Sequence, residues 1–284
     1  MKIWRVIDII QEATTFLKNK GIEDPRLNAE RLLASTLKLS RVDLYLQFEK
    51  PLSETEREIY KGLLKRRAQH EPLQYITGET EFMSLTFRVG PNILIPRPET
   101  EILVEKVIDL VKDQSFHILD IGTGSGCIAV SAAHYCPEAE ITALDISQPV
   151  LESARGNARL NHVEDRIRFK QVDILSFDPD KEIFDLIVSN PPYISENEWQ
   201  NLPPEIRKHE PKTALSDGKD GLKFYRKIAE SAVQMLLPGG TIILEIGDTQ
   251  LEPVRQILTN HTFGDIQITH DLNGIPRVIQ GKKS

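Results

Sequence analysis

Cysteine is scarce in this sequence of 284 residues, in which only Cys127 and Cys136 occur. Both fall in one predicted helix, too far apart along its axis for their sulfur atoms to bond. A protein without disulfides is typical of a reducing compartment, so we expect a cytoplasmic location. Cysteine and histidine do not cluster at the spacing of zinc ligands, and we therefore expect no structural metal.

Long hydrophobic runs are also missing. No stretch approaches the roughly 18 apolar residues that a bilayer-spanning helix needs. Within the first twenty residues the apolar positions recur at helical spacing, and charges interrupt the apolar core that a secretion signal requires. The interrupting residues are Arg5, Asp8, Glu12, Lys18 and Lys20. We expect a soluble, intracellular protein with no membrane partner.

An excess of positive charge is the third absence. Lysine and arginine number 35 against 42 acidic residues, which gives a formal net charge of −7. This balance disfavours broad contact with a phosphate backbone, so we expect no direct nucleic-acid partner. The 40% hydrophobic and 27% charged content is ordinary for a globular protein. The length suits one large domain or two modest ones.

Residues 1–70 predict a small helical domain. Asp24-Pro25 is typical of a helix start, with aspartate as the N-cap and proline at the first helical position. Ser53 and Glu56 form a capping-box pattern before another apolar helical stripe. The segment carries no candidate for chemistry, and we interpret it as a substrate-docking module.

Residues 71–96 have a different pattern. The stretches 74–77 and 82–89 are rich in strand-forming residues, with Gly78 between them. This arrangement predicts a β-hairpin that links two domains. Pro98 is then placed to open a helix that continues to Val111.

From about residue 116 onward, strand and helix patterns alternate. The strand candidates are His117–Ile121, Glu140–Asp145, Ile167–Gln171, Phe184–Ser189 and Thr241–Glu245, followed by short segments at 266–269 and 277–280. Helices are predicted near 125–135, 148–161, 221–236 and 250–259. Such alternation predicts an α/β fold with a doubly wound, mostly parallel sheet. Ligands bind such sheets at the carboxyl ends of the strands.

A glycine-rich turn follows the first of these strands; we call its residues, Gly122-Thr123-Gly124-Ser125-Gly126, the glycine turn. Its glycines let the backbone approach a ligand closely, and the next helix offers free N–H groups. The turn could serve NAD, a phosphate or S-adenosylmethionine (SAM), or only pack a helix on a strand. The spacing differs from the dinucleotide pattern. The neighbouring Asp120 suits the cationic amino end of SAM better than a pyrophosphate.

Two further acidic residues follow the next strands. Asp145 ends the second strand, where a carboxylate can accept both hydroxyls of a ribose, in NAD and SAM enzymes alike. Asp173-Ile174 follows the third strand, at a position where it could contact the edge of an adenine ring. There the aspartate could accept from the exocyclic amine, and the next backbone N–H could donate to a ring nitrogen.

The segment Asn190-Pro191-Pro192-Tyr193, which we call the asparagine turn, follows the fourth strand. Two prolines make it stiff and remove two N–H donors. The Asn190 side-chain oxygen and the Pro191 carbonyl could accept both hydrogens of one planar NH₂ group, while Tyr193 packs its ring against that group. A strand-ending loop with a packed tyrosine is the alternative. A methyl donor beside a nitrogen acceptor is the simplest chemistry that fits both turns.

These motifs resemble those of the class I SAM-dependent N-methyltransferases. Within this class the chain is similar to the peptide chain release factor glutamine N5-methyltransferases, the HemK/PrmC family. Further segments extend the similarity over nearly the whole chain: Glu71–Gly78, Ile95–Glu101, Glu210–Leu215, Leu237–Gly240 and Pro276–Val278. The asparagine turn alone would be shared with adenine-N6 methyltransferases.

The resemblance implies a seven-stranded Rossmann-like methyltransferase sheet at 97–284, preceded by the helical domain and the hairpin linker. It implies that SAM is the cofactor and that a monomer methylates the glutamine in the Gly-Gly-Gln loop of release factors. Arg97 and Thr100 would lie near the methionine part of SAM or brace the loop over it, although an ion pair between Arg97 and an acid is an alternative. A ribosomal-protein glutamine or a nucleic-acid adenine are the alternative substrates.

Overall fold

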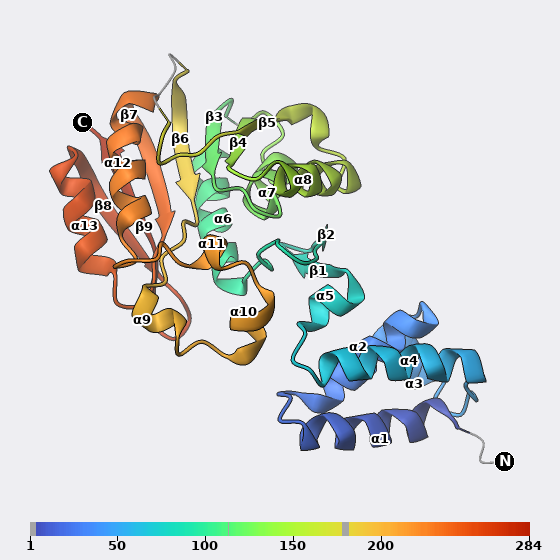
Figure 1. Ribbon diagram of the computed structural model, residues 1–284. Helices are drawn as coiled ribbons and strands as arrows, with labels where there is room; N and C mark the ends of the chain where they lie inside the picture. The colour runs from blue at the N-terminus through green and yellow to red at the C-terminus, as the bar shows by residue number, and fades with distance from the viewer. Residues whose placement is uncertain (1–3, 113, 178–181) are drawn as a thin grey trace. The chain divides into compact units, whose positions relative to one another are not determined.

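The computed structural model describes residues 4–112, 114–177 and 182–284 (Figure 1). Its contacts divide the chain into two compact units. The first, the helical unit, comprises Met1–Glu79 together with Pro203–His209. The second, the sheet unit, comprises Thr80–Leu202 and Glu210–Ser284. None of the described helices is both long and apolar enough to cross a membrane.

The helical unit is built from amphipathic helices around one apolar core. Its helices are α1 (Val6–Asn19), α2 (Pro25–Leu37), α3 (Arg41–Leu46), α4 (Glu54–Arg67), α5 (Leu73–Thr77) and α10 (Pro204–His209). The capping box of α4 is confirmed, since the Ser53 hydroxyl accepts from the Glu56 N–H at 3.2 Å and the Glu56 carboxylate accepts from the Ser53 N–H at 2.7 Å. Asp24 does precede α2, but its side chain makes no capping bond.

An ion pair joins α10 to α4 within the helical unit. The guanidinium of Arg67, which is 5% exposed, lies 2.7 Å from Glu205 of α10. Arg67 also donates to the side-chain oxygen of Asn28 on α2 at 2.7 Å. A segment from late in the sequence thus supplies a carboxylate to a nearly buried arginine.

The predicted strand at 74–77 is wrong, because these residues belong to α5. Leu73 and Ile76 are three positions apart and both pack into the helical core, so burial of one helical face overrides the local strand preference. Gly78 ends the helix at φ 84°, with its N–H donating to the Gln74 carbonyl. The hairpin itself is shorter than predicted and consists of β1 (Glu79–Phe82) and β2 (Leu85–Arg88).

The sheet unit contains seven strands in the order β5-β4-β3-β6-β7-β9-β8 (Figure 1). They are β3 (His117–Ile121), β4 (Glu140–Asp145), β5 (Ile167–Gln171), β6 (Phe184–Ser189), β7 (Leu236–Glu245), β8 (Phe263–His270) and β9 (Pro276–Lys283). The first five in this order are parallel, whereas β9 runs antiparallel to both β7 and β8. The predicted doubly wound, mostly parallel sheet is therefore confirmed. The last three strands are longer than predicted.

Helices cover both faces of this sheet (Figure 1). One apolar cluster joins the sheet to α6 (Pro98–Val111), α7 (Cys127–Tyr135) and α8 (Gln148–Leu160). The other joins it to α12 (Lys223–Met235) and α13 (Leu251–Asn260). The neighbours Ile118 and Leu119 on β3 fall in different clusters, as alternation along a strand requires. Burial on both faces explains why the strands read as nearly continuous apolar runs.

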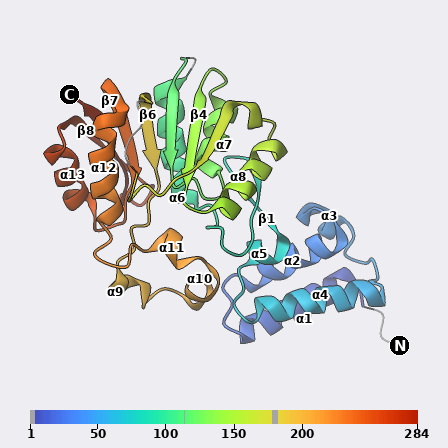
Figure 2. The ribbon, with the colours of Figure 1, turned by 45° about the horizontal axis from the view of Figure 1, so that its top comes forward.

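The carboxyl ends of β3 and β6 meet at one edge of the sheet. Ile121 and Ser189 are paired across these strands, and the Ser189 hydroxyl donates to the Ile121 carbonyl at 2.7 Å. The chain after β6 passes through the short helices α9 (Glu196–Trp199) and α11 (Lys212–Leu215) below the arrowheads of the strands (Figure 2). This edge brings the glycine turn and the asparagine turn onto neighbouring strands.

Candidate active site

Backbone bonds hold the glycine turn against β4. The N–H groups of Gly122 and Thr123 both donate to the Leu144 carbonyl, at 2.9 and 2.8 Å. Gly126 lies at φ 82°, and a Cβ there would come within 3.1 Å of the Ala154 Cβ on α8. By contrast, a Cβ on Gly122 would meet no atom within 4 Å. The turn is therefore tightly packed on its inner side and open on its outer side.

A buried carboxylate lies directly beneath this turn. Asp120 is fully buried, and its Oδ2 accepts from the Thr123 hydroxyl at 2.7 Å. Its Oδ1 has no hydrogen-bond partner among the described residues. Burial raises the pKa of Asp120 to about 7. An unpartnered carboxylate oxygen in this position suits a cationic group, and the residues present therefore fit the amino end of SAM.

Asp145 at the end of β4 comes together with the glycine turn. Its Oδ2 accepts from the Gly124 N–H at 3.1 Å and its Oδ1 from the Ser147 N–H at 2.9 Å. Burial raises the pKa of this carboxyl group. Each oxygen keeps a lone pair for a further donor, such as a ribose hydroxyl.

The third acidic position follows β5. Asp173 is half-buried and its Oδ1 accepts from the Leu175 N–H at 2.9 Å. Ile174 is 8% exposed and packs in the apolar cluster of α12 and α13. The packing of Ile174 fixes the position of the backbone that carries the Asp173 carboxylate.

The asparagine turn is fixed by side chains from other elements. The Asn190 Nδ2 donates to the hydroxyl of Thr100 on α6 at 3.1 Å. The Thr100 hydroxyl in turn donates to Oε2 of Glu245, the last residue of β7, at 2.7 Å. Because the NH₂ end of the Asn190 amide faces Thr100, its Oδ1 remains an acceptor, and no donor to it is found in the described part of the chain. Pro191 is buried and stiffens the turn.

Tyr193 closes the turn. Its phenol donates to Oε1 of Glu245 at 3.4 Å, and burial raises the pKa of this phenol, which keeps its proton. Its carbonyl accepts from the Gln250 side chain at 2.9 Å, and the same Nε2 donates to the Gly221 carbonyl at 3.1 Å. A Cβ on Gly221 would lie 2.3 Å from the Tyr193 oxygen, so only glycine fits there.

Sequence reasoning missed Glu245 and Gln250. Glu245 ends a buried apolar strand, as Asp145 does, and that position was the signal available for it. Gln250 carries no signal, because the two carbonyls to which its Nε2 donates lie 29 and 57 residues away along the chain.

Arg97 forms an ion pair. Its Nη2 lies 2.5 Å from Oε1 of Glu210, which is 6% exposed, and the other Glu210 oxygen accepts from the Ile95 N–H at 3.4 Å. The pair joins the chain before α6 to the segment that follows α10. The ion-pair alternative for Arg97 is therefore present, and a SAM-binding role for Arg97 stays a prediction.

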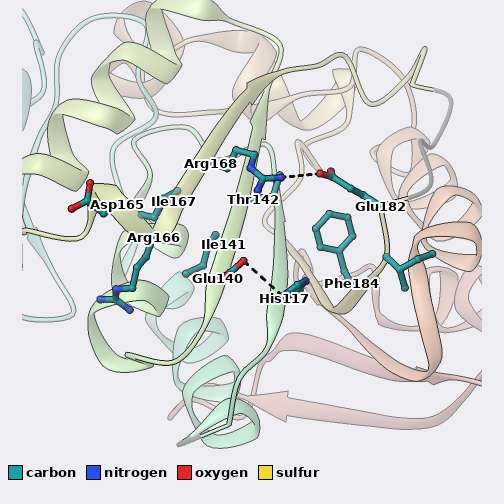
Figure 3. A pocket seen from close by; sticks show the side chains of 11 residues that line it. His117, Glu140, Ile141, Thr142, Asp165, Arg166, Ile167, Arg168, Glu182 and Phe184 are labelled. Carbon is teal, nitrogen blue, oxygen red and sulfur yellow. Dashed lines mark hydrogen bonds and ion pairs between the residues drawn. The ribbon is translucent and has the colours of Figure 1, made fainter.

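A cavity opens at the opposite edge of the sheet, around the amino ends of β3 to β6 (Figure 3). One ion pair lines it, in which Arg168 lies 2.9 Å from Glu182, and the His117 ring lies 3.7 Å from the Glu140 carboxylate. The charges of Arg168 and Glu182 offset each other. Neither turn borders the cavity, so it is separate from the candidate site.

The strand order, the glycine turn with Asp145, and the asparagine turn together define a class I methyltransferase. The family model "PrmC N-terminal domain" matches residues 8–78, and "Methyltransferase small domain" matches residues 98–209. The release factor glutamine methyltransferase of Chlorobaculum tepidum is 40% identical over 285 residues, which cover 97% of this chain and 96% of that protein. The Geobacter sulfurreducens protein of the same name is 41% identical over 282 residues, with 99% and 98% covered.

The chain belongs to the release factor glutamine methyltransferase family, and the resemblance inferred from its motifs is confirmed. Among solved structures, a methyltransferase from Pyrococcus furiosus aligns with a TM-score of 0.54 at 20% identity. That alignment covers 72% of this chain and 91% of the Pyrococcus chain. At this identity the likeness concerns the fold alone.

Proposed function

We propose that this protein transfers a methyl group from SAM to the side-chain amide nitrogen of the glutamine in the Gly-Gly-Gln loop of a peptide chain release factor. Family membership supports the substrate class. The observation that carries the proposal is the Asn190 amide, whose NH₂ end is held by Thr100 and whose oxygen stays an acceptor next to the glycine turn. A glutamine NH₂ group needs such acceptors.

The donor would be held along the carboxyl ends of β3, β4 and β5. The glycine turn would approach its amino acid part, with Asp120 facing the amino group. Asp145 would accept from the ribose hydroxyls, and Asp173-Ile174 would border the adenine. Arg97 and Thr100 would lie near the methionine part, on the side of α6. When bound, SAM supplies a methyl group that is electrophilic because it is attached to a sulfonium.

The acceptor amide would lie against the asparagine turn. Its two N–H groups would donate to the Asn190 Oδ1 and the Pro191 carbonyl, and the Tyr193 ring would pack on its plane. Methyl transfer would form the N–C bond as the methyl–sulfur bond breaks, with S-adenosylhomocysteine as the leaving group, and the nitrogen would then lose one proton to water. Both hydrogen bonds strengthen as the nitrogen gains positive charge, which favours the transition state over the bound substrate. No side chain has to act as a general base.

The helical unit, by this proposal, docks the release factor, and a monomer in the cytoplasm carries out the reaction. The proposed catalytic residues all lie in the sheet unit. The helical unit is therefore available for recognition of the protein that carries the loop.

Incubation of the purified protein with labelled SAM and a purified release factor tests this function. Mass spectrometry should find one added methyl group on the Gly-Gly-Gln peptide. A release factor with asparagine in place of that glutamine is the matched control and should stay unlabelled, because its shorter side chain does not reach the acceptor pair. An unlabelled release factor, with label appearing in ribosomal proteins incubated in a parallel reaction, would contradict the proposal.

A further inference from the structure

Glu245 is a buried carboxylate that the proposed reaction does not use. It ends β7 and is 2% exposed. Its two oxygens accept from two hydroxyl groups, Oε2 from Thr100 at 2.7 Å and Oε1 from Tyr193 at 3.4 Å. Burying a carboxylate without a cationic partner is costly. We therefore expect this buried carboxylate to have a role.

The two hydroxyl groups that donate to Glu245 connect it to the two ends of the asparagine turn. Thr100 contacts Asn190, the first residue of the asparagine turn, and Tyr193 is its last residue. The backbone of Glu245 is itself held, because the Tyr225 phenol donates to its carbonyl at 2.8 Å. A single fixed carboxylate therefore restrains both ends of the turn.

We propose that Glu245 is a positioning residue that, through Thr100, makes Asn190 present its oxygen rather than its NH₂ group to the substrate. The inference rests on the proposed function and deepens it.

The reason lies in the count of hydrogens. The Thr100 hydroxyl has one hydrogen, and an ionised carboxylate only accepts, so this hydrogen goes to Glu245. The Thr100 oxygen can then only accept from Asn190, which turns the amide NH₂ toward it. Without the carboxylate, the hydroxyl can donate to the Asn190 oxygen. The amide would then flip and present its NH₂ to the NH₂ of the substrate, which is donor against donor.

The ionisation of Glu245 should therefore affect turnover. Glu99 on α6 lies near it and disfavours its charge, while Arg277 on β9 favours it. Burial dominates and raises the pKa of Glu245 to about 7. The protonated carboxyl can donate to Thr100, so kcat should fall as the pH falls below about 7.

The test compares Thr100→Val with Thr100→Ser. Valine removes the hydroxyl at nearly constant shape, and kcat should fall about tenfold, the scale of one lost hydrogen bond, with KM for the release factor little changed. Serine keeps the hydroxyl and should restore most of the turnover. Thr241→Val, at a buried position lower on the same strand β7, controls for the loss of a buried hydroxyl. Calorimetry with S-adenosylhomocysteine checks that each variant is folded and binds.

Glu245→Gln provides a second measurement, which still tests the inference if Thr100→Val does not fold. It removes the charge at nearly constant shape and should abolish the fall of kcat below pH 7. If kcat of Glu245→Gln still falls below pH 7, the group that titrates is Asp120 and not Glu245, and the inference is overturned.

Wild-type turnover in Thr100→Val, or an equal loss in Thr241→Val, would also overturn the inference while leaving the proposed function intact. Absence of methylation by the wild-type protein would instead overturn the proposed function.

Discussion

The glycine turn and the asparagine turn follow neighbouring strands but are held in different ways. The glycine turn relies on backbone conformation and on bonds to the end of β4, such as the one from Gly124 to Asp145, 21 residues away. The asparagine turn relies on side chains from α6, β7 and the start of α13. Its bond to Thr100 spans 90 residues and its bond to Gln250 spans 57.

This difference separates two tasks. A methyl donor that is the same in every reaction can be bound by backbone groups, because their positions do not change when a side chain rotates. An acceptor amide needs one orientation of one side chain, and that orientation depends on partners that pack around it. Changes in the two turns should therefore alter different quantities, donor affinity for one and turnover for the other.

The largest effect is expected for Asn190→Ala. Loss of one preorganised acceptor should lower kcat by about 100-fold or more, the scale of losing one such polar contact. Donor affinity should stay within about twofold, because the glycine turn is untouched. Initial rates and calorimetric titration measure the two quantities. Asn197→Ala, on the exposed surface of α9, is the control. Equal losses of turnover and donor affinity would remove the distinction between the turns.

Gln250→Leu should mainly affect stability. It leaves the carbonyls of Tyr193 and Gly221 without their donor, at a cost of about 1–3 kcal/mol for each unsatisfied buried group. Chemical denaturation should show a lower free energy of unfolding, together with reduced kcat. The exposed Gln267→Leu on β8 is the matched substitution. Unchanged stability would mean that the asparagine turn does not need this distant support.

Gly126→Ala tests the glycine turn. Its φ of 82° and the close approach to Ala154 strain an alanine by about 1–2 kcal/mol, so donor affinity should fall by about tenfold. The same substitution at Gly156 meets no atom within 4 Å and should be tolerated. Calorimetry with S-adenosylhomocysteine decides the outcome. A normal donor affinity in Gly126→Ala would refute the backbone-based account.

The last prediction leaves both turns unchanged and concerns how the stability of the fold depends on pH. Burial raises the pKa of Glu245 from its usual 4.5 to about 7, so the folded state binds the proton more tightly than the unfolded state. The resulting stability is complete below about pH 4.5 and is lost as the pH rises through about 7.

Glu245→Gln stays neutral throughout this range. Its Tm relative to wild type should therefore be higher at pH 8 than at pH 5, by about 2–4 °C for each kcal/mol of difference. Asp120 titrates in the same window in both proteins and cancels from the comparison. Thermal scans at the two pH values measure the difference, and an equal Tm difference at both would contradict the raised pKa.

The same contrast explains what the sequence could predict. Four strands, β3 to β6, have the predicted bounds, because each is an apolar run closed by a polar or glycine-containing segment. The glycine turn could be predicted for the same reason, because the residues that define it are consecutive in the sequence. Residues 74–77 were predicted as strand because their composition favours strand, while burial in the helical core decides their actual conformation.

The supports of the asparagine turn had no local signal. Family resemblance predicted Thr100 near the methionine part of SAM or bracing the loop over it, and gave no sign that its hydroxyl bonds to Asn190 and Glu245. Those contacts exist only because α6, β6 and β7 come together in the folded sheet unit. Spacing along the chain carries no information about such a junction, and the structure was needed to find it.

The ion pair between Arg67 and Glu205 has a consequence for protein engineering. The helical unit takes α10 from a part of the sequence far beyond its own first stretch, so the chain passes between the units three times. A gene fragment that stops at residue 79 would leave a nearly buried guanidinium without its carboxylate. The helical unit therefore cannot be transferred to another enzyme as a single continuous fragment of the sequence.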